Sequence, residues 1–202
     1  MPLTRTTYLE AVNLVLQMMG EAPVSGLTGQ FGLSQQASDA IATASRKVMM
    51  EGWSFNTDYQ RTLQRDSVTN QIDVPASALR VEINRFDYSS LDIVQRGSKL
   101  YDRKNNTYVF TQDIKADVSF GLEWDELPEH ARRFIAVTAG RELQQSIVGS
   151  DELNKLNLGM EFEARSAFME IETTTSSHNM LQGNPNIAGP YLSYIPSQAL
   201  RR

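Results

Sequence analysis

The residues best placed to perform chemistry in this chain are four carboxylates clustered within seven positions: Glu123, Asp125, Glu126 and Glu129. Two carboxyl groups at a suitable separation are enough for glycoside hydrolysis, so Glu123 and Glu126 are candidates for the acids of a carbohydrate hydrolase. Acidic residues also gather at helix N-termini, where they interact favourably with the helix dipole. Because Pro128 fits the first turn of a helix, the sequence favours the structural role and keeps hydrolysis as the alternative.

Other reactive groups are few. The chain has no cysteine and two histidines, His130 and His178, which excludes disulfides and thiolate metal sites and leaves no tight metal-ligand spacing. Three glycines at positions 26, 29 and 32 are not followed by Lys-Ser/Thr, so they form neither a phosphate loop nor a dinucleotide fingerprint. We therefore predict no catalytic residue, no cofactor and no metal, with His130 as a surface residue at a charged helix start.

Composition is that of a globular protein. The 202 residues are 41% hydrophobic and 21% charged, enough for one or two domains with a real core. No apolar run reaches membrane-spanning length, and the N-terminal residues lack the apolar segment of a secretory signal. We expect a protein made in the cytoplasm that has no membrane contact.

Negative charge is concentrated in one part of the chain. Residues 124–175 contain five basic and ten acidic residues, whereas residues 1–52 contain three and four, and residues 53–123 contain nine and ten. A protein that grips a DNA duplex collects positive charge to displace phosphate counterions. The distribution therefore disfavours a soluble nucleic-acid-binding module, while allowing passive contact with DNA.

Helical periodicity predicts two helices at the front of the chain. Thr7 and Glu10 fit a capping box for the first helix, Ser34 is the predicted cap of the second, and Gly52 ends it. The predicted buried stripes are Tyr8, Val12, Val15 and Met19 in the first helix, and Ala37, Ile41, Ala44 and Val48 in the second. The small residues of the second stripe favour close approach of another helix.

From residue 53 the period changes to the alternation of strands. Strands are predicted over residues 72–74, 79–83, 92–94, 100–101, 108–110 and 116–122. Gly97 supplies the positive φ of a short hairpin turn. This pattern predicts an antiparallel β-rich unit inserted at residues 53–123.

Two further helices follow the β-rich unit. Pro128 and Ser150 mark their starts, and the predicted stripes are Ile135, Ala139, Leu143 and Ile147, then Leu153, Leu156, Met160, Ala164, Ala167 and Ile171. The predicted fold class is α+β: a mainly helical bundle of about four helices from residues 1–52 and 124–175, the inserted β-rich domain, and an extended C-terminal tail at residues 176–202.

Five short motifs, in order, resemble a known family. They are AVN with MGEAPVSGL at residues 11–27, GWSFN at 52–56, LYDR at 100–103, LPE at 127–129 and NMLQG at 179–183. Together they resemble the tail tubular protein A family of short-tailed, podovirus-type bacteriophages over roughly residues 8–183.

The resemblance implies a structural head-to-tail adaptor, not an enzyme. Copies of such a protein form a twelvefold ring in the virion neck, between the portal protein and the tail nozzle, a tail tubular protein B-like protein. DNA passes through the ring during packaging and ejection without tight binding. A ring needs head-to-tail contacts, for which the small-residue face of the second helix is a candidate.

Two groups of residues acquire expected roles from this interpretation. Glu161, Glu163, Glu170 and Glu172 are expected to line the channel, where acidic walls would not hold DNA. Trp53, Phe55, Tyr191, Tyr194 and Ile195 are expected to bind partner proteins. The alternatives are that the C-terminal residues fold back on their own subunit, and that Trp53 and Phe55 stack on a sugar or fill a seam beside the β-rich unit.

Overall fold

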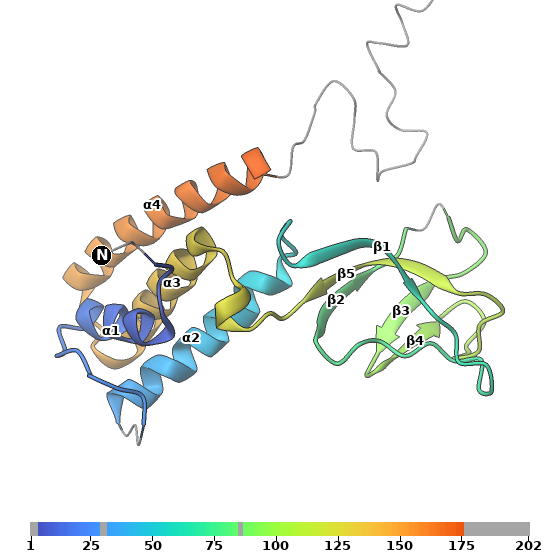
Figure 1. Ribbon diagram of the computed structural model, residues 1–202, viewed down its shortest axis with the longest axis horizontal. Coiled ribbons are helices and arrows are strands. Elements are labelled where there is room, and N and C mark those ends of the chain that lie inside the picture. The colour runs from blue at the N-terminus through green and yellow to red at the C-terminus, as the bar shows by residue number, and fades with distance from the viewer. Residues whose placement is uncertain (1–3, 29–31, 85–86, 176–202) are drawn as a thin grey trace, which may run out of the picture. The chain divides into compact units, whose positions relative to one another are not determined.

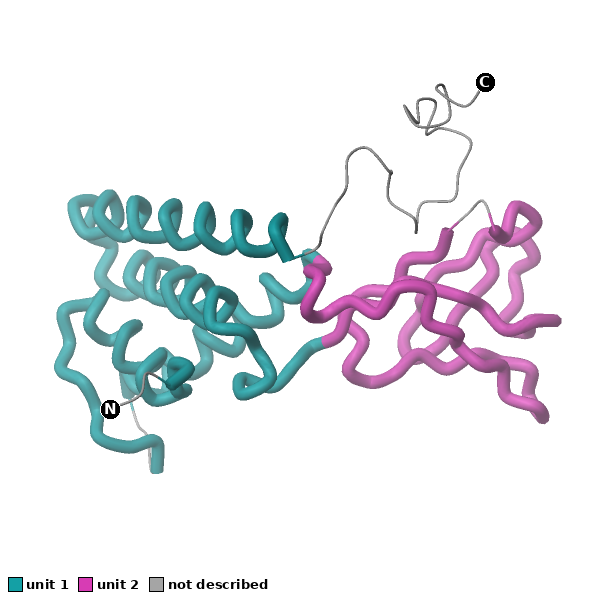
Figure 2. The backbone as a smooth tube through the Cα atoms, turned by 45° about the horizontal axis from the view of Figure 1, so that its top comes forward, with its two compact units in different colours: residues 1–51, 121–175 teal, residues 52–120, 176–202 magenta. Residues whose placement is uncertain are grey.

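The computed structural model describes residues 4–28, 32–84 and 87–175 (Figure 1). These residues form four α-helices, a short 3-10 helix and two antiparallel sheets, so the predicted α+β class is confirmed. The chain divides into two compact units, coloured separately in Figure 2. The helical unit contains residues 1–51 and 121–175, and the β unit contains residues 52–120. Within the described ranges, no helix combines the length and the apolar character that membrane crossing requires.

Helices α1 (Tyr8–Met18) and α2 (Leu33–Met50) follow the predicted stripes closely. The capping box of Thr7 and Glu10 is present, and the alanines and aliphatic residues of the α2 stripe are fully buried. The prediction of Ser34 as a cap is wrong. Helix α2 begins two residues earlier, at Leu33 with Gly32 as its N-cap, so Ser34 lies inside the first turn and is buried.

Helix α3 (Glu129–Ile147) is the centre of the helical unit and packs against α1, α2 and α4. Its burial exceeds one stripe, because it is surrounded by three helices. Fully buried residues follow one another from Phe134 to Ala139, whereas Ile147, predicted to face the core, is 44% exposed. Gly140 allows α1 to approach, since a Cβ there would lie 2.4 Å from the sulfur of Met18.

The β unit contains a three-stranded sheet and a hairpin. Strand β5 (Ile114–Phe120) lies between β1 (Thr57–Leu63) and β2 (Ala78–Glu82), and both pairings are antiparallel. Strands β3 (Ile93–Arg96) and β4 (Lys99–Asp102) form the predicted hairpin, with Gly97 at φ 61°. Strands β2 and β5 also occur where predicted, within two residues at each end.

One strand of the β unit, β1, was not predicted, and two predicted strands, at residues 72–74 and 108–110, do not form; Ile72 and Asp73 make only isolated bridges with Arg65 and Lys99. Strand β1 has no alternating apolar pattern, because its residues between Thr57 and Leu63 are exposed and a bulge interrupts its pairing with β5. Residues 108–110 are not a strand. Thr107 forms an isolated bridge with Asp102, and the amide of Phe110 donates to the carbonyl of Asn70.

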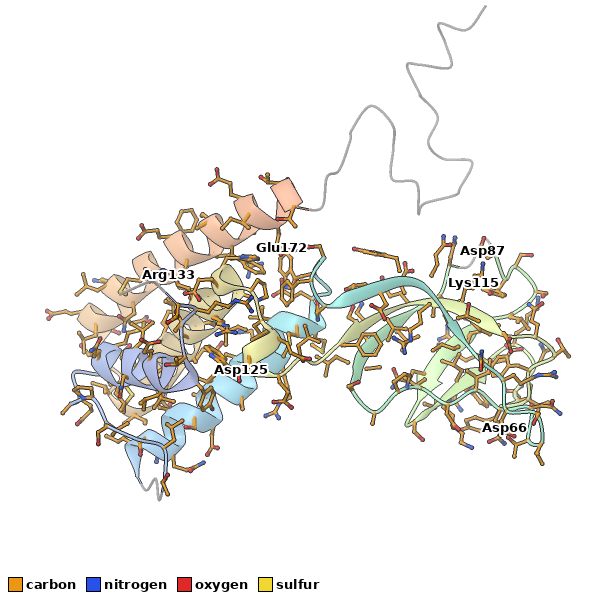
Figure 3. All side chains as sticks on the ribbon, viewed as in Figure 1. Asp66, Asp87, Lys115, Asp125, Arg133 and Glu172 are labelled. Atoms are coloured by element: carbon orange, nitrogen blue, oxygen red, sulfur yellow. The ribbon has the colours of Figure 1, made fainter. Side chains whose placement is uncertain are left out.

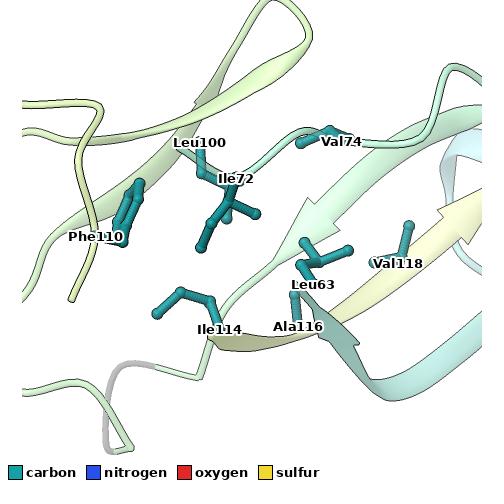
Figure 4. Packing of buried hydrophobic residues seen from close by; sticks show 8 residues of the cluster. All are labelled: Leu63, Ile72, Val74, Leu100, Phe110, Ile114, Ala116 and Val118. Carbon is teal, nitrogen blue, oxygen red and sulfur yellow. The ribbon is translucent and has the colours of Figure 1, made fainter. Parts of the chain in front are cut away.

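The β unit has an apolar core. Figure 4 shows the cluster, which consists of Leu63, Ile72, Val74, Leu100, Phe110, Ile114, Ala116 and Val118. Both sheets and the segments between them contribute to it. The hairpin and the three-stranded sheet therefore share one core.

Candidate assembly surfaces

The acidic cluster before α3 organises the chain locally. Glu123 is the N-cap of the 3-10 helix η1 (Trp124–Glu126) and Glu126 is its last residue; the amide of Glu123 donates to Glu126 Oε2 at 3.0 Å. Glu129 accepts from the amide of Thr6 at 2.8 Å and from its hydroxyl. Asp125 is exposed nearby (Figure 3). Two of these carboxylates thus hold backbone amides, as helix-start acids do.

Arg132 completes this junction. Its guanidinium is 3% exposed and donates to the carbonyls of Leu127 (2.9 Å), Asp125 (2.8 Å) and Thr6 (2.7 Å). The indole of Trp124 also donates to the Thr6 carbonyl at 3.1 Å. The segment before α1 is therefore fastened to the start of α3, and sequence reasoning missed this role of Arg132 because its partners are all carbonyls.

His130 is largely buried, contrary to the surface position predicted for it. Its Nε2 lies 3.0 Å from Glu172 Oε1 of α4, and its ring lies 5.4 Å from that of Phe168. Phe168 also stacks on Phe134 of α3, with ring centroids 5.2 Å apart. Glu172 is labelled in Figure 3. The His130–Glu172 pair joins α3 to α4. Within the described ranges, no cluster of side chains could hold a metal ion, at this pair or elsewhere.

Helix α4 (Asp151–Thr175) packs against α3 with an unusually polar side. Its buried residues are Asn157, Ala164, Phe168 and Glu172, and Glu161 is half-buried and paired with Arg141. The Asn157 amide donates to the carbonyl of Met18 at 3.5 Å. We call these five residues the inner stripe. As predicted, Ser150 caps the helix, accepting from the amide of Leu153 at 3.4 Å.

The apolar stripe predicted for α4 is therefore wrong at four of its six positions, whereas Ala164 is buried as predicted and Leu153 is half-buried. Leu156 is 68% exposed, Ala167 is exposed, and Met160 and Ile171 are also exposed. Their spacing is helical, but a different side of α4 contacts α3. That side carries Phe168 and the partners of His130 and Arg141. Large apolar side chains remain on the exposed surface: Leu156, Leu158, Met160, Phe162, Met169 and Ile171.

These exposed residues fall on two sides of α4. The first flank consists of Leu158, Phe162, Arg165 and Met169, and the second flank of Leu156, Met160, Glu163 and Ala167. Ile171 continues the second flank by one turn. Contiguous exposed apolar patches are rare on monomeric soluble proteins and mark interaction sites.

The four glutamates predicted to line a channel separate into two pairs. Glu161 and Glu172 belong to the inner stripe and are paired within the subunit. Glu163 and Glu170 are exposed, and with Glu152 they occupy nearly the same angular position on α4, between the two flanks. We call these three residues the outer acidic stripe; Glu163 lies where it meets the second flank.

A hollow between α2 and α3 is the second candidate surface of the helical unit. Its volume is about 370 Å³, and Gln36, Asp39, Ala40, Thr43, Glu142, Leu143, Ser146 and Ile147 line it. The small-residue stripe of α2 does not face this hollow, because Ala37 and Ala44 are buried within the subunit. The expectation that this stripe contacts a neighbouring copy is wrong.

The β unit presents a rigid turn around Asp66. Its carboxylate accepts from the amide (2.6 Å) and the hydroxyl (2.9 Å) of Thr69 and from the amide of Val68 (2.9 Å), and these bonds hold the pKa of Asp66 below its ordinary value. Val68 is 85% exposed at the turn. The position of Asp66 is labelled in Figure 3.

Asp102 is buried in the β unit. Burial raises the pKa of its carboxyl, but hydrogen bonds from the amides of Asp92 (3.1 Å) and Lys104 (2.9 Å) and from the Asn105 side chain outweigh burial and lower it. The carboxylate thereby closes the turn after β4.

The remaining predicted contact residues are only partly visible. Trp53 and Phe55 are half-buried residues of the β unit, and their role in partner binding stays a prediction. Tyr191, Tyr194, Ile195 and the alternative in which they fold back lie outside the described residues, as does His178.

Comparison with known proteins decides the family. The family model for tail tubular proteins matches residues 9–178. The chain belongs to the tail tubular protein family. Tail tubular protein A of Klebsiella phage KP34 is 28% identical over 156 residues, which cover 77% of this chain and 80% of that protein. The predicted resemblance is confirmed.

The family places this tail tubular protein among the structural proteins of phage tails. Its location is the virion tail, where it assembles with other phage proteins. The comparisons give no support to carbohydrate hydrolysis by Glu123 and Glu126. The surfaces that matter are thus those that contact other chains.

Proposed function

We propose that this tail tubular protein is a head-to-tail adaptor whose copies close into a twelvefold ring between the portal and the tail nozzle. The observation that carries the proposal is the reversed polarity of α4. This helix buries Asn157 and Glu172 while Leu156 and Phe162 are exposed. A second protein surface that covers the exposed residues would remove this apolar area from water.

A ring accounts for exposed apolar residues on two sides of one helix. Closed cyclic assemblies use heterologous contacts, in which two different patches of each subunit meet. The first and second flanks of α4 are two such patches. The inner stripe, by contrast, is already satisfied within the subunit through His130, Arg141 and Phe134.

The channel proposal now rests on the exposed carboxylates. We propose that Glu163 and Glu170, joined by Glu152, face the DNA passage. Lysine or arginine in their place would bind phosphates and release counterions, which holds DNA and slows its movement. Changing Glu152 and Glu170 together to lysine is expected to give salt-dependent DNA binding by the purified protein and slower genome ejection. Unchanged binding and ejection would refute the acidic lining.

Partner contacts are also proposed for residues outside α4. Tyr191, Tyr194 and Ile195 are proposed to dock on the portal, because aromatic anchors dominate interface energetics. Trp53, Phe55 and the exposed turn at Val68 are proposed to contact the nozzle or a neighbouring copy. Deletion of residues 184–202 is expected to abolish portal binding, and a truncated chain that still binds the portal would show that the segment folds back instead.

Mass measurement tests the ring directly. The purified chain is measured alone and after addition of portal rings from the same phage, and the complexes are imaged by electron microscopy. We expect twelve copies bound to each portal as a closed ring. Single copies bound without mutual contact would contradict the adaptor proposal.

A further inference from the structure

We propose that the α4 helices of neighbouring copies lie side by side around the channel, with the first flank of one copy packed on the second flank of the next. This inference rests on the ring proposed above and names the surfaces that close it. The occupant of each flank is therefore a second copy of this chain.

The two flanks match in spacing. The first flank has residues at 158, 162, 165 and 169, and the second at 156, 160, 163 and 167. Both series advance by four, three and four residues, which is the spacing of helix seams that interdigitate. Members of the second flank precede those of the first by two residues throughout. Because the rise is 1.5 Å per residue, parallel helices bring these members within about 3 Å of the same height.

The paired layers are chemically compatible. Leu156 meets Leu158, and Met160 meets Phe162, the most exposed phenylalanine of the helix at 75%. In the third layer Glu163 meets Arg165, which gives charge complementarity at the same register. Arg165 also lies 3.5 Å from Glu51 of its own subunit, an exposed pair that contributes little by itself. If α4 runs along the ring axis, as the proposed packing requires, cyclic symmetry makes neighbouring α4 helices parallel and level, so this register is the one the ring would use.

The angle between the flanks fits a closed ring. Residues two positions apart lie about 200° apart around a helix, which leaves about 160° on the other side. In a ring of twelve, the directions to the two neighbours enclose about 150° on the side of the lumen. The smaller arc of α4 carries Glu152, Glu163 and Glu170, and the larger arc carries the inner stripe that contacts α3. The geometry thus points the acidic stripe inward.

The opening has a suitable width. Packed helices lie about 8–10 Å apart. Twelve α4 axes at the upper spacing form a ring roughly 39 Å across, and subtracting one helix diameter leaves an opening of roughly 28 Å. Double-stranded DNA fits such an opening.

The hollow between α2 and α3 of the neighbouring copy is an alternative binding site for Phe162, in place of the second flank. On α3, Arg141 faces α4 and Leu143 lines the hollow; two residues apart, they point about 200° apart. A contact of Phe162 with this hollow on the next copy would also be heterologous. The α4 register is favoured because it pairs four layers instead of one side chain.

Cross-linking separates these arrangements, because the chain contains no cysteine. Rings assembled on the portal from a Met160→Cys/Phe162→Cys variant are treated with a short bis-maleimide. The two thiols cannot join within one subunit, since they point about 200° apart. We expect a ladder of covalent multimers on a denaturing gel. An Ala167→Cys/Met169→Cys variant tests another layer and retains Phe162.

Thr43→Cys/Phe162→Cys is the matched control, which would link the hollow to the first flank. We expect it to remain monomeric on the gel. Rings seen by microscopy without a ladder in the α4 variants would overturn the contact between the first and second flanks but not the ring. A ladder found only in the control would have the same meaning. Absence of rings from the unaltered chain would overturn the adaptor proposal together with the seam.

Charge reversal gives an independent test. Glu163→Arg or Arg165→Glu alone places like charges in the third layer, so the fraction of chain in rings is expected to fall. The combined variant restores the pair in reverse and is expected to recover ring assembly. Failure of the combined variant to recover, with both single variants folded, would contradict the register.

Discussion

Helix α4 and the β unit distribute their large apolar residues differently. The β unit encloses an apolar cluster that includes Ile72, Leu100 and Phe110, and it leaves few large apolar side chains outside. Helix α4 buries Asn157 and Glu172 and exposes six large apolar residues. The difference teaches that apolar content alone does not locate a core. In the β unit the apolar side chains stabilise the subunit, whereas in α4 most of the large apolar side chains are exposed.

The largest effect is expected from the one aromatic residue that α4 does bury. Phe168→Ala removes a side chain that is 1% exposed and stacked on Phe134, and should lower the free energy of unfolding by about 3–5 kcal/mol. Chemical denaturation followed by circular dichroism measures the change. A loss below 1 kcal/mol would mean that α4 is not held by this contact.

The next effect concerns the β unit. Asp102→Asn weakens hydrogen bonds from the amides of Asp92 and Lys104 to a charged acceptor, and should cost about 1–3 kcal/mol near neutral pH. Hydrogen exchange of the β4 amides reports the stability of this unit. Asp73→Asn, at an exposed carboxylate 3.8 Å from Lys99, is the control and should change little.

The same carboxylate predicts a pH dependence. The pKa of Asp102 is lower in the folded protein, so its contribution is fully present above the unfolded value of about 3.9. This contribution of Asp102 to stability is lost as the pH falls through the pKa of Asp102 in the folded protein. The difference in stability between the unaltered protein and Asp102→Asn should therefore shrink below about pH 4. A difference that grows on acidification would contradict this sign.

A smaller effect should follow from the polar pair in the α3–α4 contact. Glu161→Leu alone leaves the half-buried guanidinium of Arg141 without this partner and should cost about 1 kcal/mol. Arg141→Met combined with Glu161→Leu should recover most of the loss, because apolar replacement of both partners is often neutral. Equal losses in both variants would show that the pair itself stabilises the contact.

The smallest effect on stability is expected at Phe162. Phe162→Ala should change the free energy of unfolding by less than about 0.5 kcal/mol, as surface substitutions usually do. Compared with Phe168→Ala, it changes the same residue type on the same helix. Ring assembly on the portal should nevertheless fall, and a variant that assembles normally would remove Phe162 from the contact.

Much of the fold could be predicted from the sequence where local signals suffice. The capping box at Thr7, the stripe of α2 and the Gly97 hairpin depend on neighbouring residues and were predicted correctly. Strand β1 was missed because its side chains are mostly exposed and its pairing with β5 is interrupted by a bulge. Periodicity located helix α4, but it cannot tell which side faces the core.

The candidate surfaces show the same limit. A helical wheel assumes that the apolar side is buried, and this assumption placed Leu156 and Met160 inside and Glu172 outside. The correct orientation depends on His130, Arg141 and Phe134, which are distant in sequence from their partners. Among the glutamates, only tertiary contacts distinguish Glu161 and Glu172 from Glu163 and Glu170.

The discontinuity of the helical unit has a consequence for synthesis on the ribosome. Helices α1 and α2 emerge first, but α3, against which both pack, follows only after residues 52–120. The nascent β unit has its entire apolar cluster available by residue 118 and can fold as soon as it leaves the exit tunnel. The faces of α1 and α2 that α3 covers in the folded protein remain exposed until α3 has emerged. Chaperone binding would be most useful in this interval.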